Sequence, residues 1–238
     1  MSQTTSQRVQ SWFIPIGIVV IAGLLITLIV LQLRGSSDPA AESPGADEAQ
    51  AEEPDLTFVE TRDSEDVQTA GPVDAPVAMV VYSDYQCPFC ARWTNDTLPE
   101  MMEYAEQGDL RIEWRDVNQY GENSERAALA AHAAGNQGEF WEYHALLFPD
   151  GDHLSPEQLT EEHLIELADE LGLDTDQFEA DLTSPEVLET VQQYAVEGQE
   201  LGVSGTPTFV LGGEPIVGAQ PTNAFVDTFE EALAEAGQ

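Results

Sequence analysis

The sequence predicts an α/β domain with a helical insertion, preceded by one transmembrane helix and a disordered acidic linker. Three observations predict this: an apolar run near the N-terminus, a polar acidic stretch after it, and then alternating strand-like and helix-like segments. We expect a short cytoplasmic stub at 1–11, an anchor at 12–33, a linker at 34–55 and a folded domain at 56–238. The insertion in that domain is expected at about 120–202.

The apolar run extends from Trp12 to Leu33, with no charged residue between Arg8 and Arg34. It is long enough to cross a hydrocarbon core as a helix. A cleaved signal peptide is the alternative, but its apolar region would be shorter and would be followed by small residues at a cleavage site. The positive-inside rule, applied to Arg8, puts the N-terminus in the cytoplasm. We therefore expect a single-pass protein of the cell membrane with its main domain outside the cytoplasm.

The linker after the anchor has no aromatic or β-branched residue and is rich in Asp, Glu, Pro and Ser. Such a segment cannot bury enough apolar surface to offset the entropy of ordering. The whole chain has 45 acidic residues against seven basic ones, a net charge of −38. That charge argues against nucleic acid or an anionic membrane surface as the ligand. We interpret it as a solubilising surface suited to high salt, the alternative being attraction of cationic partners.

The first part of the folded domain has the pattern strand, helix, strand. Leu56–Glu60 is a short possible strand, and Val77–Ser83 is a β-branched apolar run typical of a buried strand. A helical stretch follows, which Pro99 should kink or restart, and Leu110–Val117 is the next strand. This order predicts a parallel strand pair with a right-handed crossover. One helix face is apolar, formed by Leu98, Met101, Met102 and Ala105.

The second part is helical from about Ser124 to Leu201 and then returns to strands. Gly172 is placed to end one helix, and Gly212-Gly213 separates two short strands as in a hairpin. Thr222 is expected to cap a last helix. The helical stripes are Leu164, Leu167, Ala168 and Leu171; Val187, Val191, Tyr194 and Ala195; and Phe225, Phe229, Ala232 and Leu233. The hairpin strands are Thr208–Leu211 and Pro215–Val217.

The chain has two cysteines, Cys87 and Cys90, separated by two residues. A structural disulfide is one interpretation, but a bridge between residues so close in sequence removes little chain entropy. A structural zinc site would need two further ligands, and the histidines show no paired spacing; they are His132, His144, His153 and His163. The redox interpretation explains the position too. Cys87 falls at a helix N-cap, where unpaired N–H groups stabilise a thiolate. Pro88 suits the first helical position. Cys90, three residues after Cys87, can resolve a mixed disulfide.

A second element supports the redox interpretation. Thr206-Pro207 leads directly into the strand at Thr208. A cis bond before this proline is compatible with its position, and the Thr206 backbone could pair with an extended substrate chain by strand addition. An ordinary turn proline is the alternative.

These motifs together resemble the thioredoxin superfamily and, within it, the DsbA-like proteins. The resemblance covers the chain from about Leu56 onward and is most specific in Tyr82–Cys90, Gly205–Thr208 and Gln137–His144. It implies a thioredoxin fold with Cys87 as the attacking thiolate, Cys90 as the resolving thiol and Pro207 as the cis-proline. It implies no cofactor beyond a redox-active Cys87–Cys90 disulfide, and no metal. Trp141 and His144 would be packing and capping residues.

Two positions depart from the family pattern. Many relatives have a buried carboxylate six residues before the first cysteine, where this chain has Val81; proton transfer to Cys90 would then use water or another acid, with Asp84 as the candidate. Strongly oxidising members have histidine just before the second cysteine, where this chain has Phe89. We therefore expect a redox potential between those of strong oxidants and reductases.

The function that follows is oxidation of cysteine-containing exported polypeptides by dithiol–disulfide exchange. The resemblance implies a membrane-embedded partner that reoxidises the cysteine pair. One alternative is a reductase or isomerase supplied by a membrane-embedded reductant, for instance in cytochrome maturation. Another is a chaperone-like binding module whose disulfide is incidental.

Overall fold

A five-stranded mixed sheet organises the part of the chain that the computed structural model describes, residues 55–237. The strand order is β1-β3-β2-β4-β5. The central pair, β2 and β3, is parallel, as the strand–helix–strand pattern predicts, and the other neighbours are antiparallel. The strands are β1 (Thr69–Ala70), β2 (Val77–Ser83), β3 (Leu110–Asp116), β4 (Thr208–Leu211) and β5 (Glu214–Val217).

The expected anchor and all but the last residue of the expected linker lie outside the described residues. Within residues 55–237, no helix is both long and apolar enough to cross a membrane.

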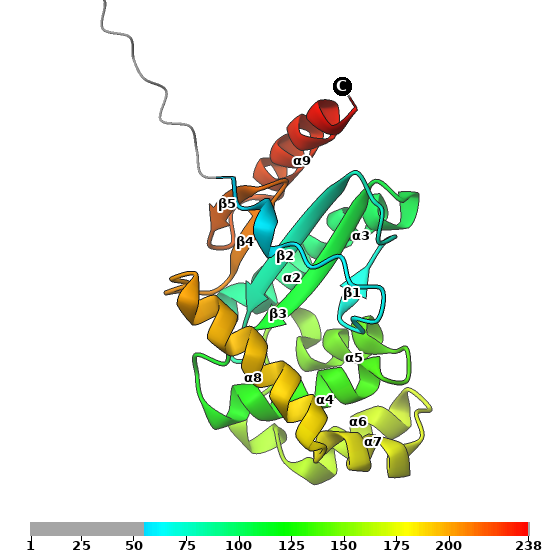
Figure 1. Ribbon diagram of the computed structural model, residues 1–238. Helices are drawn as coiled ribbons and strands as arrows, with labels where there is room; N and C mark the ends of the chain where they lie inside the picture. The colour runs from blue at the N-terminus through cyan, green and yellow to red at the C-terminus, as the bar shows by residue number, and fades with distance from the viewer. Residues whose placement is uncertain (1–54, 238) are drawn as a thin grey trace, which may run out of the picture. The chain divides into compact units, whose positions relative to one another are not determined.

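Helices cover both faces of the sheet and its lower end in Figure 1. They are α2 (Pro88–Asp96), α3 (Leu98–Gln107), α4 (Glu122–Gly135), α5 (Phe140–Leu147), α6 (Glu161–Glu170), α7 (Thr175–Leu182), α8 (Pro185–Glu200) and α9 (Thr222–Ala236). Short 3₁₀ turns are η1 (Thr57–Val59), η2 (Pro149–Gly151) and η3 (Pro156–Gln158). The insertion α4–α7 lies beyond the carboxyl ends of β2 and β3 (Figure 1), which places it beside the turn that carries the cysteines.

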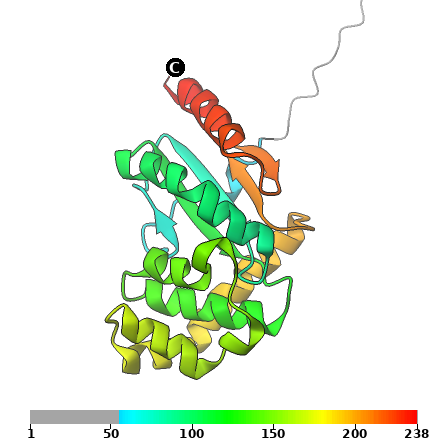
Figure 2. The same ribbon diagram turned by 180° about the vertical axis from the view of Figure 1, so that it is seen from behind.

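All seven residues of β2 are buried, because the strand has helices or turns over both faces. Met79 and Val81 point into the main core with α2, α3 and α9, whereas Val80 and Tyr82 point into a smaller cluster with η1. Figure 2, from behind, shows the α2–α3 pair crossing the face opposite to α8. This double coverage explains why the strand is a continuous apolar run instead of an alternating one.

The predicted break at Pro99 is confirmed: α2 ends and α3 begins around Thr97. The hairpin at Gly212-Gly213 is also confirmed. Both glycines have positive φ, 59° and 87°, as a two-residue turn between right-twisted strands requires.

Two local expectations were wrong, and one short strand was not predicted. Leu56–Glu60 is not a strand: Leu56 N–H donates one bond to Gly213, and the chain then turns into η1. β1 was missed because a two-residue strand has no periodicity to detect. Thr222 does not cap α9; it is the first helical residue, and its hydroxyl donates to the Asp96 carbonyl 3.2 Å away.

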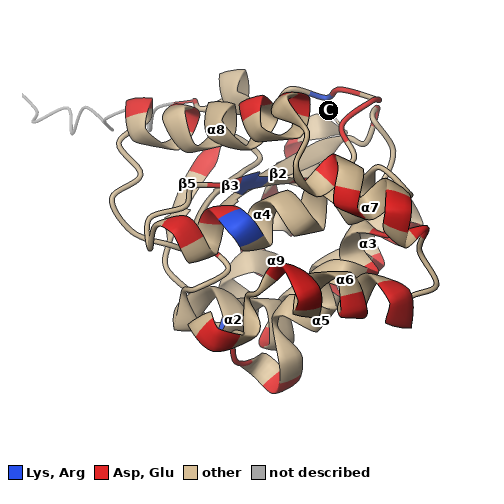
Figure 3. Ribbon diagram, turned by 90° about the horizontal axis from the view of Figure 1, so that it is seen from below, with Lys and Arg blue, Asp and Glu red and all other residues tan. Residues whose placement is uncertain are grey.

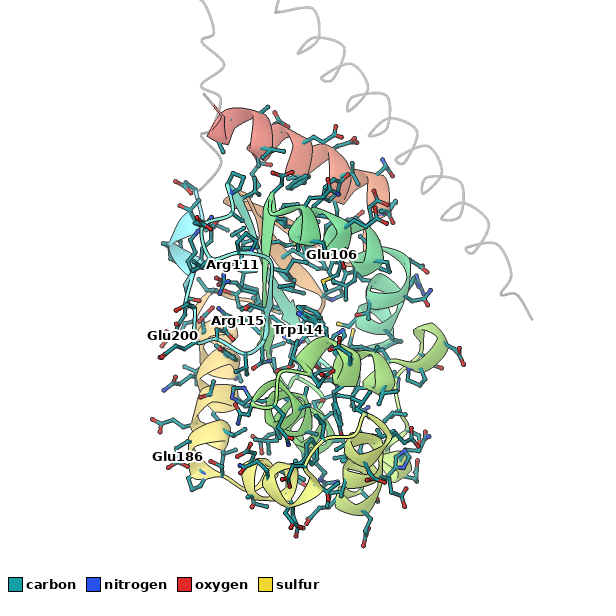
Figure 4. The ribbon with its side chains drawn as sticks, turned by 90° about the vertical axis from the view of Figure 1, so that its right-hand side faces the viewer. Glu106, Arg111, Trp114, Arg115, Glu186 and Glu200 are labelled. Atoms are coloured by element: carbon teal, nitrogen blue, oxygen red, sulfur yellow. The ribbon has the colours of Figure 1, made fainter. Side chains whose placement is uncertain are left out.

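A buried charged cluster covers the other face of β3. We define the Glu113 cluster as Arg111, Glu113 and Arg115 of β3 with the residues of segment 60–66 that bind them. Arg111 Nε and Arg115 Nη2 each donate to Glu113, at 2.9 and 2.8 Å, and Arg115 Nη1 donates to Asp66 at 2.8 Å. Figure 4 shows Arg111 and Arg115 on the side of β3 away from Trp114. The cluster therefore leaves the inner face of β3 to the main core and the cysteine site.

Candidate active site

The cysteine pair lies where β2 turns into α2. Cys87 is the N-cap of α2, with extended backbone angles, and Pro88 occupies the first helical turn. The Cys90 and Ala91 N–H groups both donate to the Cys87 carbonyl at 3.1 Å. These are ordinary helical bonds to the N-cap carbonyl. The N–H groups that favour the Cys87 thiolate, as the N-cap prediction required, are those of Cys90 and Phe89.

The structure lowers the pKa of Cys87 to about 6. The largest cause is a hydrogen bond from the Cys90 thiol, which favours the Cys87 thiolate; burial opposes it. The Thr206 hydroxyl and the N–H groups of Cys90 and Phe89 lower the pKa of Cys87 further. Cys87 is therefore largely ionised at neutral pH, the state that attacks disulfides.

The pKa of Cys90 is shifted in the opposite direction to that of Cys87. Both side chains are buried, but burial together with the neighbouring Cys87 raises the pKa of the Cys90 thiol well above its ordinary value. The Ser83 hydroxyl and the Asp84 N–H lower the pKa of Cys90, but by less. No disulfide joins the two cysteines in the structure. The pair thus consists of one thiolate and one thiol that must gain or lose a proton in each exchange cycle.

The loop before β4 lies directly against Cys87. The Thr206–Pro207 peptide bond is cis, and Cys87 Sγ is 3.3 Å from the Thr206 carbonyl oxygen. The Thr206 hydroxyl is buried, and within residues 55–237 its only hydrogen-bond partner is the Cys87 sulfur. Two segments 119 residues apart in sequence are thus brought into contact, as the two-motif prediction required.

The contacts of Asp84 do not match the role expected from the sequence, which was proton transfer to Cys90. Its carboxylate accepts from Gln86 N–H at 2.7 Å, Ser124 Oγ at 2.7 Å and Tyr120 N–H at 3.1 Å. None of these bonds goes to a cysteine. Asp84 therefore joins the cysteine turn to the start of α4, and its role as the acid for Cys90 has no support in these contacts.

Two exposed aromatic side chains flank the buried sulfurs: Phe89 is 52% exposed and Tyr120 is 56% exposed. The guanidinium of Arg92 lies 5.2 Å from the centre of the Phe89 ring. Burial raises the pKa of Tyr120, and so do the charge of Cys87 and a hydrogen bond with it. Tyr120 is a site residue that the sequence reasoning missed, since its contact depends on how the β3–α4 loop folds back over the cysteine turn.

His144 and Trp141 pack in the main core, as expected. His144 is fully buried, bonds to the Tyr85 hydroxyl at 3.0 Å through Nδ1 and stacks edge-on against Trp114. Burial lowers the pKa of His144 to about 3, so it stays neutral. Trp141 Nε1 donates to the Thr69 carbonyl at 2.9 Å. Within residues 55–237, no three His, Cys, Asp or Glu side chains are grouped as metal ligands.

A protein-family model described as Thioredoxin matches residues 63–231, well over half of the chain. The chain belongs to the thioredoxin family. It is 30% identical over 151 residues to the probable disulfide bond formation protein D of Bacillus anthracis, covering 61% of this chain and 70% of that protein. Within the family it is a DsbA-like member.

Solved structures are similar across the same domain. BdbD from Bacillus subtilis, in its oxidised form, is 25% identical with a TM-score of 0.62, covering 70% of this chain and 92% of BdbD. A thioredoxin-like oxidoreductase from Silicibacter pomeroyi is 29% identical with a TM-score of 0.59, covering 71% of this chain and 98% of that one.

A second group of relatives is much longer than the matched region. The Na(+)/H(+) antiporter NhaA 3 of Salinispora tropica is 33% identical over 171 residues, which is 70% of this chain but 24% of that protein. The chain therefore spans about a quarter of the length of the antiporter relatives it matches.

Proposed function

We propose that this DsbA-like protein is a thiol–disulfide oxidoreductase that oxidises cysteine-containing exported polypeptides by exchange through Cys87 and Cys90. The single observation that carries the proposal is the unequal cysteine pair at the N-cap of α2. Cys87 has a pKa of about 6 and lies against the Thr206–Pro207 loop, whereas Cys90 is buried beneath it with a raised pKa. The similarity to the disulfide bond formation protein adds support, because the chain covers most of that relative.

The exchange begins with the pair as a disulfide. A substrate thiolate attacks Cys87 Sγ, the Cys87–Cys90 bond breaks, and Cys90 leaves as a thiolate that takes up a proton. A second substrate thiolate then attacks the substrate sulfur of the mixed disulfide, and Cys87 leaves. The substrate has lost two electrons and gained a disulfide, and the protein pair has gained both electrons. The Thr206 backbone holds the substrate chain as an added strand beside Cys87.

The low pKa of Cys87 supports the oxidising direction. A stabilised thiolate makes the reduced protein more stable and its disulfide more oxidising. A pKa of about 6 lies between about 7 for thioredoxin and about 3.5 for DsbA, which favours an intermediate potential. A reductase or isomerase, kept reduced by a membrane-embedded donor, remains the second candidate because an intermediate potential serves either direction.

We further propose that residues 12–33 anchor the protein in the cell membrane with its N-terminus in the cytoplasm. Residues 34–55 would then tether the domain, 56–238, outside the cytoplasm, where a membrane-embedded reoxidase restores the disulfide. The uncharged apolar run from Trp12 to Leu33 supports this arrangement.

Replacement of Cys90 tests the proposal in intact cells. Cys90→Ala removes the resolving thiol, so covalent adducts with client proteins should accumulate at Cys87 and disappear on reduction. Cys87→Ala/Cys90→Ala is the matched control and should trap nothing. A binding module with an incidental disulfide would show no adducts with either variant. Alkylation of free thiols in cells that express the natural chain then decides the direction: a mostly oxidised pair supports the oxidase, and a mostly reduced pair supports the reductase.

A further inference from the structure

The inner face of the sheet beneath Cys90 carries an unusual pair of polar side chains. In the parallel β2–β3 register, Val81 is paired with Trp114 and Ser83 with Asp116. Paired residues of neighbouring strands point to the same face. Val81 and Trp114 lie in the main core with both cysteines, so Ser83 and Asp116 point toward the same side at the carboxyl end of the strands.

Asp116 is an acid held in place without a counter-ion among the described residues. Its side chain is fully buried. Trp114 Nε1 donates to Oδ1 at 2.9 Å and Gln68 Nε2 donates to Oδ2 at 2.8 Å. His132 Nδ1 in turn lies 2.9 Å from Gln68 Oε1. A buried carboxyl costs free energy, and these two bonds, one to each oxygen, partly offset that cost for Asp116.

Ser83 connects this acid to the resolving cysteine. Its hydroxyl is buried and, among the described residues, has no hydrogen-bond partner other than the Cys90 thiol, whose pKa it lowers. The hydroxyl can accept a proton on one lone pair while it donates its own. One water molecule between Ser83 Oγ and the Asp116 carboxyl would complete a path from Cys90 to the acid.

We propose that Asp116, acting through the Ser83 hydroxyl, is the group that gives a proton to Cys90 and takes it back in each exchange cycle. This deepens the proposed function and rests on it. When a substrate thiolate breaks the Cys87–Cys90 bond, Cys90 leaves as a thiolate and takes the Ser83 proton. The bridging water then gives a proton to Ser83 and receives one from the Asp116 carboxylic acid. When Cys90 instead attacks a mixed disulfide, the same protons move in reverse, and the Asp116 carboxylate ends as the acid. Ser83 contacts Cys90 directly. Asp116 acts on Cys90 only through Ser83 and is therefore a positioning residue.

The pKa of Asp116 suits proton exchange with Cys90. Burial raises the pKa of Asp116 to about 7, against the bonds from Trp114 and Gln68 that lower it. The charge of Asp84 raises it further and that of Arg115 lowers it. Burial raises the pKa of the neighbouring Tyr85 phenol, and the charge of Asp116 raises it further. Asp116 can therefore donate or accept a proton near neutral pH, as a general acid–base group must.

The test separates the two chemical steps of the purified, reduced full-length chain. Rapid mixing with oxidised glutathione gives a second-order attack by Cys87, then a first-order resolution by Cys90 that releases glutathione. In the natural chain the resolution rate should rise through an inflection near pH 7 as Asp116 ionises. Asp116→Asn should slow resolution about tenfold or more and remove that inflection, and it should change the first step less than about threefold.

Ser83→Ala is the second variant, since its hydroxyl has no other protein bond to lose. It should slow resolution in the same way. Thr97→Ala is the matched control: it removes a buried hydroxyl at the far end of α2, one that bonds to the Thr222 hydroxyl, and it should leave the pH profile of resolution unchanged. Unchanged resolution in both Asp116→Asn and Ser83→Ala, or an intact inflection, would overturn the relay. A natural chain that never reacts with glutathione disulfide would instead overturn the proposed function.

Discussion

Tyr120 is the side chain through which the loop after β3 acts on the nucleophile. Its hydroxyl forms a hydrogen bond with Cys87, and a donor to a thiolate stabilises the ionised form. Tyr120→Phe should therefore raise the pKa of Cys87 by about half a unit to one unit, which ultraviolet absorbance of the thiolate against pH measures. Tyr104→Phe, on α3, is the control and should leave that pKa unchanged. An equal shift in both variants would show that Tyr120 has no specific effect.

His144 and Asp116 give the protein opposing responses to acid. The unfolded histidine has a pKa near 6.5, whereas burial lowers the pKa of His144 to about 3. Below pH 6.5 the unfolded chain therefore binds a proton that the folded chain refuses, and folding stability falls as pH drops toward 3. Asp116, whose pKa is raised to about 7, binds its proton in the folded chain first and so gains stability over pH 7 to 4.

His144→Gln tests the response of His144 to acid. At pH 7 the variant loses packing and is less stable than the natural chain. Between pH 6.5 and 4.5 the natural chain should lose about 2–3 kcal/mol that the variant does not lose. Urea unfolding at both pH values measures the difference, and a gap that stays constant with pH would contradict the assignment. His163→Gln is the control, because His163 is on the surface of α6, 32% exposed.

At the scale of elements, the Glu113 cluster fastens segment 60–66 to β3. Glu113 accepts from Thr61 N–H, Thr61 Oγ1 and Arg62 N–H as well as from two arginines. Glu113→Ala would leave Arg111 and Arg115 buried without this partner, a change that costs about 3–5 kcal/mol. Chemical denaturation measures it. Glu166→Ala breaks an exposed pair with His163 and should cost less than about 1 kcal/mol. Equal losses of stability in Glu113→Ala and Glu166→Ala would show that burial does not determine how much these charged contacts contribute.

The elements that sequence predicts are those with local signals. β2 is a continuous buried run, α2 begins with Cys87-Pro88, and Gly212-Gly213 defines a two-residue turn. The approach of Thr206 to Cys87 followed from combining two motifs. The relation of Ser83 to Asp116 could not be predicted, because it depends on the β2–β3 register and no periodicity encodes register between strands separated by two helices. The same holds for Tyr120, whose contact requires the loop to fold back.

At the scale of the whole molecule, the surface is dominated by one sign of charge. The chain carries a net charge of −38, and Figure 3 shows acidic residues on most of the helices seen from below. Arg111 and Arg115 are buried in the Glu113 cluster and do not offset it at the surface. Like charges at such density repel each other and destabilise the compact state, and salt removes the repulsion because the Debye length falls from about 10 Å at 0.1 M to about 3 Å at 1 M.

The folded chain should therefore become more stable as salt rises. Raising KCl from 0.1 to about 1 M should increase the midpoint of thermal unfolding by several degrees, mainly through screening. Glu189→Gln/Glu200→Gln, on the exposed side of α8, removes two of the repelling charges and should make the midpoint less dependent on salt. The contribution of the Glu113 cluster to stability should change little with salt, because buried ion pairs are screened much less than exposed ones. If the midpoint of unfolding instead falls as salt rises, the exposed acidic residues must be stabilised by bound cations or ion pairs that salt displaces. The acidity would then be explained by binding of cationic partners and not by adaptation to high salt.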